Sequence, residues 1–358
     1  MNKKIKWFEL DIGKEETEAV TKAVSEKWIS GTGPHIKEFE QKFAEKVNAK
    51  YGIAVCNGTC GLIAILLAYK YLLKKKMPII AVPTWTYFAT VTTADLVGKI
   101  KFVDCDKKTF NMLPKLPKNT DIVMPVDVGG MPIDYDKFLS YGLPLIMDSA
   151  EALGSSYKGE PIGSIAPVHL FSLHAAKLLT TGEGGMITTS DPQLYETIRQ
   201  ICNQGYVSPV KTEYIHQIKG FNFRMTTMQA AIGLVQLNKL ERNVLRRREI
   251  MQIYRDILGE DGWYVDYQFE PSDRKSSFWL ATILVNPKIR DDLVQHLIKN
   301  DIEVKVWRPA HLQPPFIDKK QHFKNAEQLY YQNINLPVHN LLSDEDVKFV
   351  AEKIREFF

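Results

Sequence analysis

At 358 residues the chain is longer than a single hydrophobic core usually supports, so we expect two domains, or a large domain with a smaller one attached. Hydrophobic residues make up 45% of the chain and charged residues 25%, which is typical of a globular protein and argues against extensive disorder. The formal net charge of +4 is small for this length, which argues against a dedicated nucleic-acid-binding protein but allows local sites that attract phosphate.

Neither a membrane span nor a metal site is expected. The longest apolar run, GLIAILLAY, ends at Lys70 and is too short to cross a bilayer. The four cysteines form no CxxC pair and have no histidine at metal-ligand spacing, which argues against a zinc site. We therefore expect a cytoplasmic protein with reduced cysteines and no bound metal.

Short apolar runs alternate with segments of helical periodicity. The runs are GIAV, PIIAVP, KIKFVD, DIVMPV, PLIMD, VHLFS and GGMITT. Several are apolar throughout, as strands buried on both faces are. In one helical segment, just before the first run, Ile36, Phe39, Phe43 and Val47 share one face of a helix. The alternation predicts an α/β fold with a mostly parallel sheet flanked by helices, in which ligands bind at the carboxyl ends of the strands.

The pattern changes at MTTMQAAIGLVQLNKLERN, which predicts a long helix followed by a smaller mixed α/β region. We place the boundary between a large domain (1–238) and a small C-terminal domain (239–358) on this helix. Its basic run RNVLRRREI is interpreted as a solvated helix face that could also border an anionic substrate. The chain ends in a stretch that predicts a helix capped by Ser343.

Two stretches carry candidate phosphate ligands. In AVCNGTCGL a predicted strand runs through Asn57, Gly58 and Thr59 into an apolar helix, whose free backbone N–H groups would attract an anion. Thr59 could instead simply cap that helix. Ser172, at the end of VHLFS and five residues before Lys177, is the second candidate.

Other residues suit a ring-shaped cofactor. Asp148 follows an apolar strand, where it could cap the next turn or pair with a cationic ring nitrogen. Most lysines are solvated, but Lys177 held in a dry pocket would be a nucleophile toward carbonyl groups. The aromatic residues Trp85, Tyr87 and Phe88 belong either to the core or to a wall that stacks on a ring. A phosphate-binding turn, a stacking aromatic, a carboxylate and a nucleophilic lysine are together what pyridoxal 5'-phosphate (PLP) requires.

The order of these motifs resembles that of the DegT-type nucleotide-sugar aminotransferases, PLP-dependent enzymes of fold type I in the aspartate aminotransferase superfamily. The resemblance covers nearly the whole chain. It rests on seven ordered stretches: SGTGPHIKEFEQKFAEK, NGTCGL, PTWTYFAT, DSAEALGSSYKG, FSLHAAKLLTTGEGGMITT, GFNFRMTTMQAAIGL and PAHLQPPF. It implies PLP as cofactor and a homodimer with shared active sites.

The resemblance also implies residue roles. Lys177 would bind PLP covalently as a Schiff base and then act as the base, and Asp148 would pair with the pyridine nitrogen. The implied cofactor-binding residues are Gly58, Thr59, Cys60, Tyr87, Asp148, Glu151, Ser172, Lys177 and Asn222.

Among these implied ligands, Thr59 and Ser172 would bind the phosphate and Tyr87 would stack on the ring. Asn222 would reach the phosphate held by the other subunit of the dimer. Glu151 stands where relatives carry Gln, His or Glu, and would lie near the cofactor or the sugar.

Two stretches depart from the family pattern. Residues 126–130 read VDVGG where many relatives read VHLYG, and residues 203–205 read NQG where NHG is common. Both changes replace a histidine near the site, so they bear on substrate preference. His174 either shapes the turn before Lys177 by hydrogen bonding or takes part in proton transfer.

The stretch LLTTGEGG is similar to family members that aminate C4, whereas C3-aminating members more often read like LGALGDGG. The resemblance thus implies amino transfer from L-glutamate to the C4 keto carbon of a nucleotide-linked 4-keto-6-deoxyhexose, giving a viosamine- or perosamine-type sugar for polysaccharide biosynthesis. Alternatives are a C3 aminotransferase, a dehydratase that uses pyridoxamine phosphate, and a non-catalytic regulator. Lys177 argues against the dehydratase, which typically carries His there, and a regulator should tend to lose Lys177 or Asp148. The sequence leaves the nucleotide base open.

Overall fold

The computed structural model describes residues 4–206, 215–259 and 264–358. In these ranges the helices are α1 (Lys14–Ser25), α2 (Pro34–Lys46), α3 (Gly58–Leu72), α4 (Phe88–Val97), α5 (Tyr135–Leu139), α6 (Pro192–Cys202), α7 (Thr227–Leu258), α8 (Arg290–Lys299), α9 (Lys324–Gln332) and α10 (Asp344–Phe357). The strands are β1 (Tyr51–Val55), β2 (Ile79–Pro83), β3 (Lys99–Val103), β4 (Ile122–Val123), β5 (Ile146–Asp148), β6 (Ser156–Tyr157), β7 (Glu160–Pro161), β8 (Val168–Ser172), β9 (Gly185–Thr189), β10 (Asp266–Tyr267), β11 (Arg274–Lys275), β12 (Ala281–Leu284) and β13 (Asn333–Leu336).

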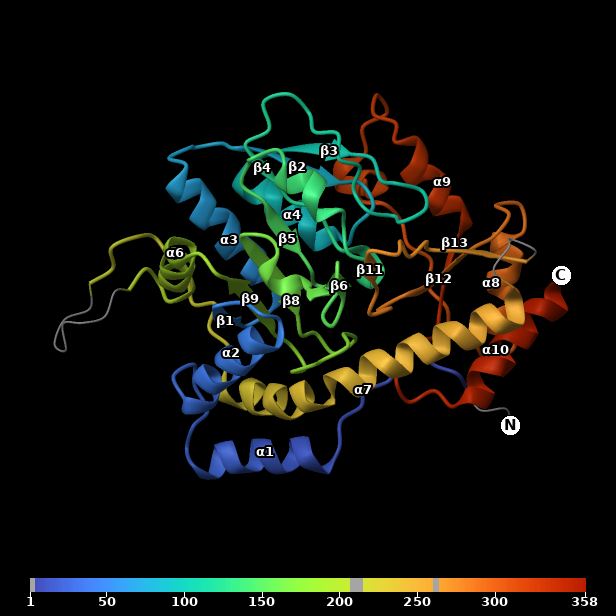
Figure 1. The fold of residues 1–358 in the computed structure, drawn as a ribbon, viewed down its shortest axis with the longest axis horizontal. Coiled ribbons are helices and arrows are strands. Elements are labelled where there is room, and N and C mark those ends of the chain that lie inside the picture. The colour runs from blue at the N-terminus through green and yellow to red at the C-terminus, as the bar shows by residue number, and fades with distance from the viewer. Residues whose placement is uncertain (1–3, 207–214, 260–263) are drawn as a thin grey trace.

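The central sheet has the strand order β1-β9-β8-β5-β4-β2-β3 (Figure 1). Hydrogen-bonded ladders form β1-β9-β8-β5 and β3-β2-β4, and parallel bridges from Val123 to Leu145 and from Val126 to Asp148 join them. The pairs β5·β8, β2·β3 and β2·β4 are parallel, whereas β9 is antiparallel to both of its neighbours. The predicted mostly parallel sheet is confirmed. Strand β9 runs antiparallel because residues 173–184 form turns instead of a crossover helix.

Helices cover both faces of this sheet. Alternate residues of β1 show the two sides, since Ile53 and Val55 are buried with α3, α4 and α6, whereas Ala54 is buried with α2 and α7. The predicted face of α2 is confirmed, because its phenylalanines Phe39 and Phe43 are fully buried in the same hydrophobic cluster as Ala54. The carboxyl ends of the parallel strands are left between these layers as the place for a site.

Helix α7 connects the central sheet to a second, smaller α/β unit (Figure 1). There β10, β12 and β13 form an antiparallel sheet whose core includes residues of α8 and α10. The N-terminal residue Ile5 joins this core and pairs with Ile302. Ser343 caps α10 as predicted, since its hydroxyl accepts a hydrogen bond from the Asp346 N–H at 3.1 Å. The domain boundary at 238/239 falls within α7 and stays a prediction.

The basic run in α7 is only partly a solvated face. Its arginines bind three different segments: Arg242 pairs with Asp11, Arg246 with Asp344, and Arg248 with Glu270. Arg247 is buried and donates to the carbonyl oxygens of Phe278 and Trp279. That interpretation is therefore wrong for Arg246, Arg247 and Arg248, which segments far away in the sequence partly or fully cover, whereas Arg242 remains exposed as predicted.

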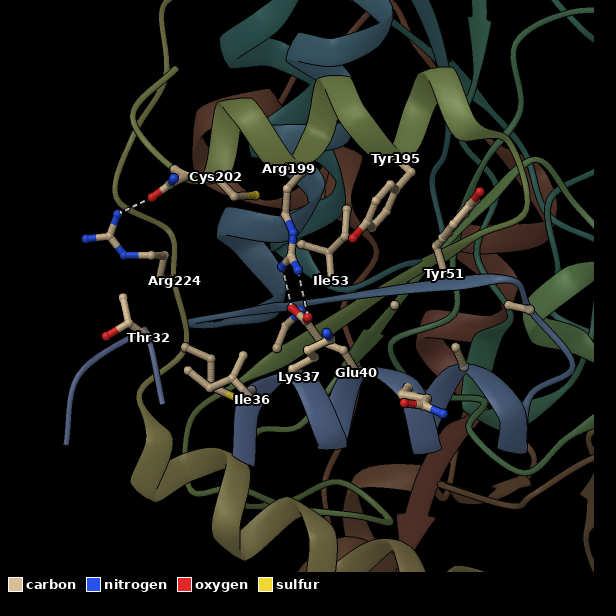
Figure 2. A pocket seen from close by; sticks show the side chains of 18 of the residues that line it. Thr32, Ile36, Lys37, Glu40, Tyr51, Ile53, Tyr195, Arg199, Cys202 and Arg224 are labelled. Atoms are coloured by element: carbon tan, nitrogen blue, oxygen red, sulfur yellow. Dashed lines mark hydrogen bonds and ion pairs between the residues drawn. The ribbon is translucent and has the colours of Figure 1, made fainter. Parts of the chain in front are cut away.

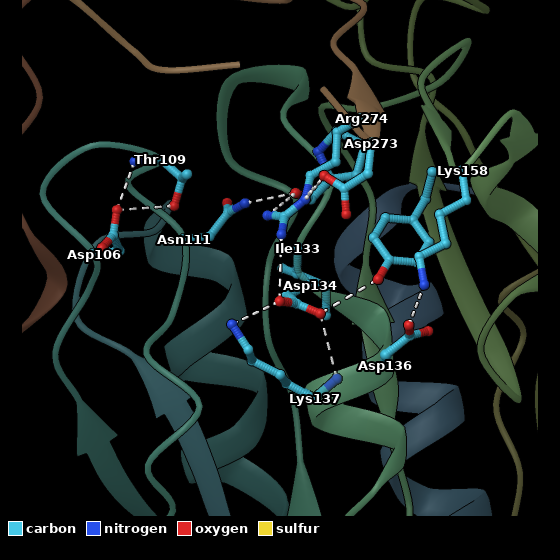
Figure 3. Close-up of polar contacts among 12 residues, drawn as sticks. Asp106, Thr109, Asn111, Ile133, Asp134, Asp136, Lys137, Lys158, Asp273 and Arg274 are labelled. Atoms are coloured by element: carbon cyan, nitrogen blue, oxygen red, sulfur yellow. Dashed lines mark hydrogen bonds and ion pairs between the residues drawn. The ribbon is translucent and has the colours of Figure 1, made fainter. Parts of the chain in front are cut away.

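A strap around β11 returns from the small unit to the central sheet. Strand β11 pairs antiparallel with β6. The largely buried guanidinium of Arg274 lies 3.5 Å from Asp134 and donates to the Pro132 carbonyl at 3.3 Å (Figure 3). Its charge also lies over the ring of Tyr157. This attachment carries the next residues, 276–280, toward the predicted site.

Across the described ranges, every helix is too short or too polar to traverse a lipid bilayer. In the same ranges, no three His, Cys, Asp or Glu side chains are grouped so that they could hold a metal ion.

Candidate active site

Most of the predicted site residues lie at one edge of the central sheet. Asp148 is the last residue of β5 and Ser172 the last of β8. Gly58 and Thr59 begin α3 directly after β1, and Tyr87 precedes α4 after β2. The edge formed by the carboxyl ends of the strands therefore brings together residues that are far apart in the sequence, as expected for this sheet type.

Asp148 is buried, and both of its carboxylate oxygens accept hydrogen bonds. The Thr90 hydroxyl donates to Oδ2 at 2.7 Å, and the Ala150 N–H donates to Oδ1 at 3.1 Å. Burial raises the pKa of Asp148 above its usual value, whereas these two donors and the charge of Lys177 lower it. The two interpretations of Asp148 are thus compatible, because the side chain caps the next turn and is also a buried carboxylate.

Lys177 is largely shielded from water, its side chain being 14% exposed. Its Nζ lies 3.4 Å from the centroid of the Trp279 indole and 3.9 Å from Oε1 of Glu151. Burial lowers the pKa of Lys177, while the carboxylates of Glu151 and Asp148 raise it. A lysine of this kind is available as a neutral amine far more readily than a solvated one.

Glu151 links the lysine to the unusual VDVGG stretch. Its Oε2 accepts a hydrogen bond from the Gly129 N–H at 2.8 Å, and Gly129 has a φ of 67°, a conformation that favours glycine. Burial raises the pKa of Glu151 to about 7, against the opposing effect of the Lys177 charge. Asp127 of the same stretch is also buried, with a pKa raised to about 6 by burial, and accepts from the hydroxyls of Ser149 and Tyr135.

The N-terminus of α3 and the end of β8 form a cradle of donors. Asn57 caps the helix, because its Oδ1 accepts from the Cys60 N–H at 2.8 Å, so the alternative in which Thr59 is the cap is wrong. Thr59 is exposed. Gly58 lies beside Ser172, since a Cβ added to the glycine would be in ordinary van der Waals contact with the Ser172 side chain at 3.4 Å. Two hydroxyls and the free N–H groups of the helix end suit a phosphate group.

Tyr87 and Asn222 lie at the surface. Tyr87 is 65% exposed, with its ring centroid 6.5 Å from that of Trp307. The Asn222 side chain is also exposed, although the backbone on its C-terminal side is fixed to the central sheet by a hydrogen bond from the Cys56 N–H to the Phe223 carbonyl. Of the predicted residues, the structure brings together Asp148, Glu151 and Lys177, and it leaves Asn222 pointing outward.

His174 shapes the turn before Lys177. Its Nδ1 accepts from the Ala176 N–H at 3.2 Å, and its ring is exposed. This geometry favours the hydrogen-bonding interpretation over a part in proton transfer.

Sequence reasoning missed two residues of the site. Thr90 lies in a quoted motif, three residues after Tyr87, and a hydroxyl one helical turn from a predicted ring-stacking residue was a usable signal. Trp279 lies about a hundred residues from Lys177 and reaches it through the β11 strap. No local pattern marks it.

A separate cavity of about 670 Å³ lies between α2, β1 and α6 (Figure 2). A two-pronged ion pair between Glu40 and Arg199, at 2.6 and 2.9 Å, crosses it. Its walls include Asn203 and Arg224 but neither Lys177 nor Asp148. The candidate active site is therefore the strand-end cluster and not this cavity.

The comparisons with known proteins show the family to which the chain belongs. The DegT/DnrJ/EryC1/StrS aminotransferase family matches residues 10–355. A GDP-perosamine synthase of Escherichia coli O157:H7 is 36% identical, covering 96% of this chain and 95% of that protein. GDP-perosamine synthases of Vibrio cholerae and Caulobacter vibrioides are 30% and 33% identical, covering 98% and 93% of this chain and 98% and 92% of those proteins.

Among solved structures, Streptococcus pneumoniae Spr1654, named as a sugar aminotransferase, superimposes with a TM-score of 0.91 at 26% identity over 98% of both chains in its PMP form. The same protein is also known in a PLP form. The expected fold class and the resemblance inferred from the seven motifs are confirmed over nearly the whole chain.

Proposed function

Because the chain belongs to the DegT/DnrJ/EryC1/StrS aminotransferase family, we propose that it moves an amino group from L-glutamate to the C4 keto carbon of a GDP-linked 4-keto-6-deoxyhexose, giving a perosamine-type sugar. The expected class, a PLP-dependent nucleotide-sugar aminotransferase, is confirmed by the family and its relatives. The observation that carries the proposal is the buried Lys177 amine next to Asp148 and Glu151. The names of three relatives support guanine as the base and C4 as the site.

The strand-end residues fit PLP. When bound, PLP supplies an electron sink for a carbanion formed at the amino-bearing carbon. The hydroxyls of Thr59 and Ser172 and the N–H groups of α3 hold its phosphate. The carboxylate of Asp148, kept in place by Thr90, pairs with the ring nitrogen and keeps it protonated. The exposed ring of Tyr87 supplies the stacking face.

Lys177 has two tasks. Its lowered pKa provides the neutral amine that anchors the cofactor, and once released the same amine takes a proton from the donor carbon and returns it at the acceptor. Oε1 of Glu151, which lies 3.9 Å from Nζ, stabilises the positive charge that Lys177 acquires when it is protonated. The buried surroundings exclude water from this exchange.

Each active site is built from two chains of a homodimer. The exposed amide of Asn222 lies on a segment fixed to the central sheet, so it is presented outward in a defined position. It donates to the phosphate held by the partner.

The test has two parts. Borohydride reduction of the PLP-loaded protein, followed by peptide mapping, should place the cofactor on Lys177. Incubation with L-glutamate and a GDP-linked 4-keto-6-deoxyhexose should give a product whose NMR spectrum shows nitrogen at C4. Cofactor fixed on another lysine would overturn the site, and an amine at C3 would overturn the regiochemistry. Turnover only with a UDP-linked N-acetylated sugar would overturn the assignment of the nucleotide and leave the chemistry standing.

A further inference from the structure

The Lys177 ammonium lies against an aromatic face. The Trp279 ring centroid lies 3.4 Å from Nζ, closer than the Glu151 carboxylate at 3.9 Å. The Trp279 side chain also binds the backbone next to the lysine, since its Nε1–H donates to the Ala176 carbonyl at 2.8 Å. Trp279 therefore contacts both the ammonium of Lys177 and the backbone of the preceding residue, Ala176, and these two contacts fix the indole relative to the ammonium.

The backbone that presents Trp279 is strained and firmly held. Phe278 has a φ of 49°, which is an outlier for a bulky residue and costs free energy unless the surroundings enforce it. Arg247 donates to the Trp279 carbonyl at 3.1 Å, and the Leu280 N–H donates to the Gly129 carbonyl at 3.3 Å. The strain is thus maintained at the position where the indole meets Lys177.

Two further indoles fix the orientation of Trp279. Trp7 and Trp307 pack edge-on against it, with ring centroids at 6.3 and 5.6 Å. Trp279 itself is 7% exposed. The indole therefore cannot swing away from the lysine without disturbing both neighbours.

We propose that Trp279 is a positioning residue that holds the amino group of Lys177 beside Glu151 and Asp148 whenever this amine is not bonded to the cofactor. The inference rests on the role proposed above for Lys177. An ammonium over an indole face is attracted by the ring quadrupole, and the attraction strengthens when water is excluded. Trp279 thereby keeps the released amine in one place and favours its charged form.

The charged groups facing Lys177 come from β5, the turn after it and α7, and they act in both directions. Asp148, the last residue of β5, and Glu151, in the turn after it, favour the charged form of Lys177. Arg247 of α7 disfavours this form. Burial also disfavours it. Trp279 has two opposite effects, because its face attracts the ammonium while its bulk removes water. An experiment can separate these effects by the direction in which the Lys177 titration moves.

The test follows acetylation of Lys177 by acetic anhydride in the full-length, cofactor-free protein between pH 6 and 11, with peptide mass spectrometry as readout. Trp279→Leu keeps an apolar cover but removes the aromatic face, so the labelling midpoint should fall by about one pH unit, a roughly tenfold change in the amine–ammonium equilibrium. Trp279→Phe retains an aromatic face and should restore most of the shift. Trp7→Leu removes an indole that packs on Trp279 but leaves the Nε1–H bond from Trp279 to the Ala176 carbonyl, so the midpoint should fall by much less than in Trp279→Leu.

An unchanged or raised midpoint in Trp279→Leu would overturn the proposal, because a merely water-excluding Trp279 lets the pKa of Lys177 return toward its ordinary value when it is removed. An equal fall in Trp7→Leu would also overturn it, since the effect would then come from loosening of the cluster. If Trp279→Leu does not fold, Trp279→Phe decides, with a small downward shift expected and a rise contradicting. The borohydride mapping described above tests the role of Lys177 separately, so the two failures are distinguishable.

Discussion

The carboxyl of Glu151 is buried between the Gly129 amide and the Lys177 ammonium, and burial raises its pKa to about 7. In the unfolded chain the same group releases its proton near pH 4.5. Between these values the folded chain binds more protons than the unfolded chain, so rising pH lowers the free energy of unfolding. The cost of this buried charge is present above pH 7 and absent below pH 4.5.

Glu151→Gln keeps an acceptor for the Gly129 amide but removes this titration. Relative to the wild type, the variant should gain on the order of 1–3 kcal/mol of stability as the pH rises from 5 to 7.5. Thermal unfolding of the cofactor-free proteins at several pH values measures the difference. A wild-type-to-variant difference that stays constant over this range would contradict it, since Asp148 and Asp127 titrate in both proteins.

Thr90 is expected to keep Asp148 charged. Thr90→Val removes the hydroxyl donor to Oδ2 with little change in shape, and a hydrogen bond to a carboxylate contributes about 1.5–3 kcal/mol. The bond favours the ionised form, so the destabilisation should be largest at pH 8 and should shrink as the pH falls and Asp148 is protonated. Urea unfolding at pH 4 and pH 8 measures it.

Thr93→Val is the matched control, because the Thr93 hydroxyl is buried on the same helix but donates only to the Thr90 carbonyl. Its cost should not depend on pH. Equal pH dependence of the two variants would show that Thr90 does not act on the Asp148 charge.

At the scale of residues, the sequence predicted the site side chains that lie at a strand end or beside a turn. Asp148 ends a strand, Ser172 ends another, and Lys177 precedes a glycine-rich turn. Trp279 has no such signal, because its place depends on how the β11 strap pairs with β6. Long-range pairing of short strands is not encoded in hydrophobic periodicity, so this part of the site could not be predicted.

At the scale of elements, the N-terminus of α3 combines a helix cap, Asn57, with the proposed phosphate site. Asn57→Ala removes the cap on the Cys60 N–H and should lower the free energy of unfolding by about 0.5–2 kcal/mol. Asn57→Asp keeps the cap, so its stability should stay near that of the wild type. The added negative charge next to Gly58 and Thr59 should nevertheless weaken PLP binding at least about tenfold through repulsion of the phosphate.

Urea unfolding of the cofactor-free protein and absorbance titration with PLP measure the two effects independently. Wild-type affinity in Asn57→Asp would place the phosphate away from α3. Weakened binding with unchanged stability would support the cradle of Thr59 and Ser172.

Also at the scale of elements, hydrophobic periodicity predicted which segments are buried but not the direction of every strand. The apolar runs and the amphipathic face of α2 were predicted because buried strands and buried helix faces have distinct periods. The antiparallel direction of β9 was not predicted, because an apolar run does not encode the direction of its strand. The engaged arginines of α7 were missed because their partners are distant in the sequence.

At the scale of the whole molecule, the shared active site is the remaining expectation, and mixed dimers test it. Lys177→Ala removes the anchoring amine, and Asn222→Ala removes an exposed amide, so cofactor retention should fall roughly ten- to a hundredfold in the second variant.

If Asn222 serves the partner's site, a mixed dimer has one site with both defects and one with neither. Activity should then recover to about a quarter of the wild-type level when equal amounts of the two inactive or impaired parents exchange subunits completely, because about half of the dimers are mixed and each has one intact site. If Asn222 serves its own chain, every site in a mixed dimer keeps one defect. Complete exchange without recovery, with the parents alone as the matched controls, would therefore assign Asn222 to its own subunit and leave the Lys177 chemistry unaffected.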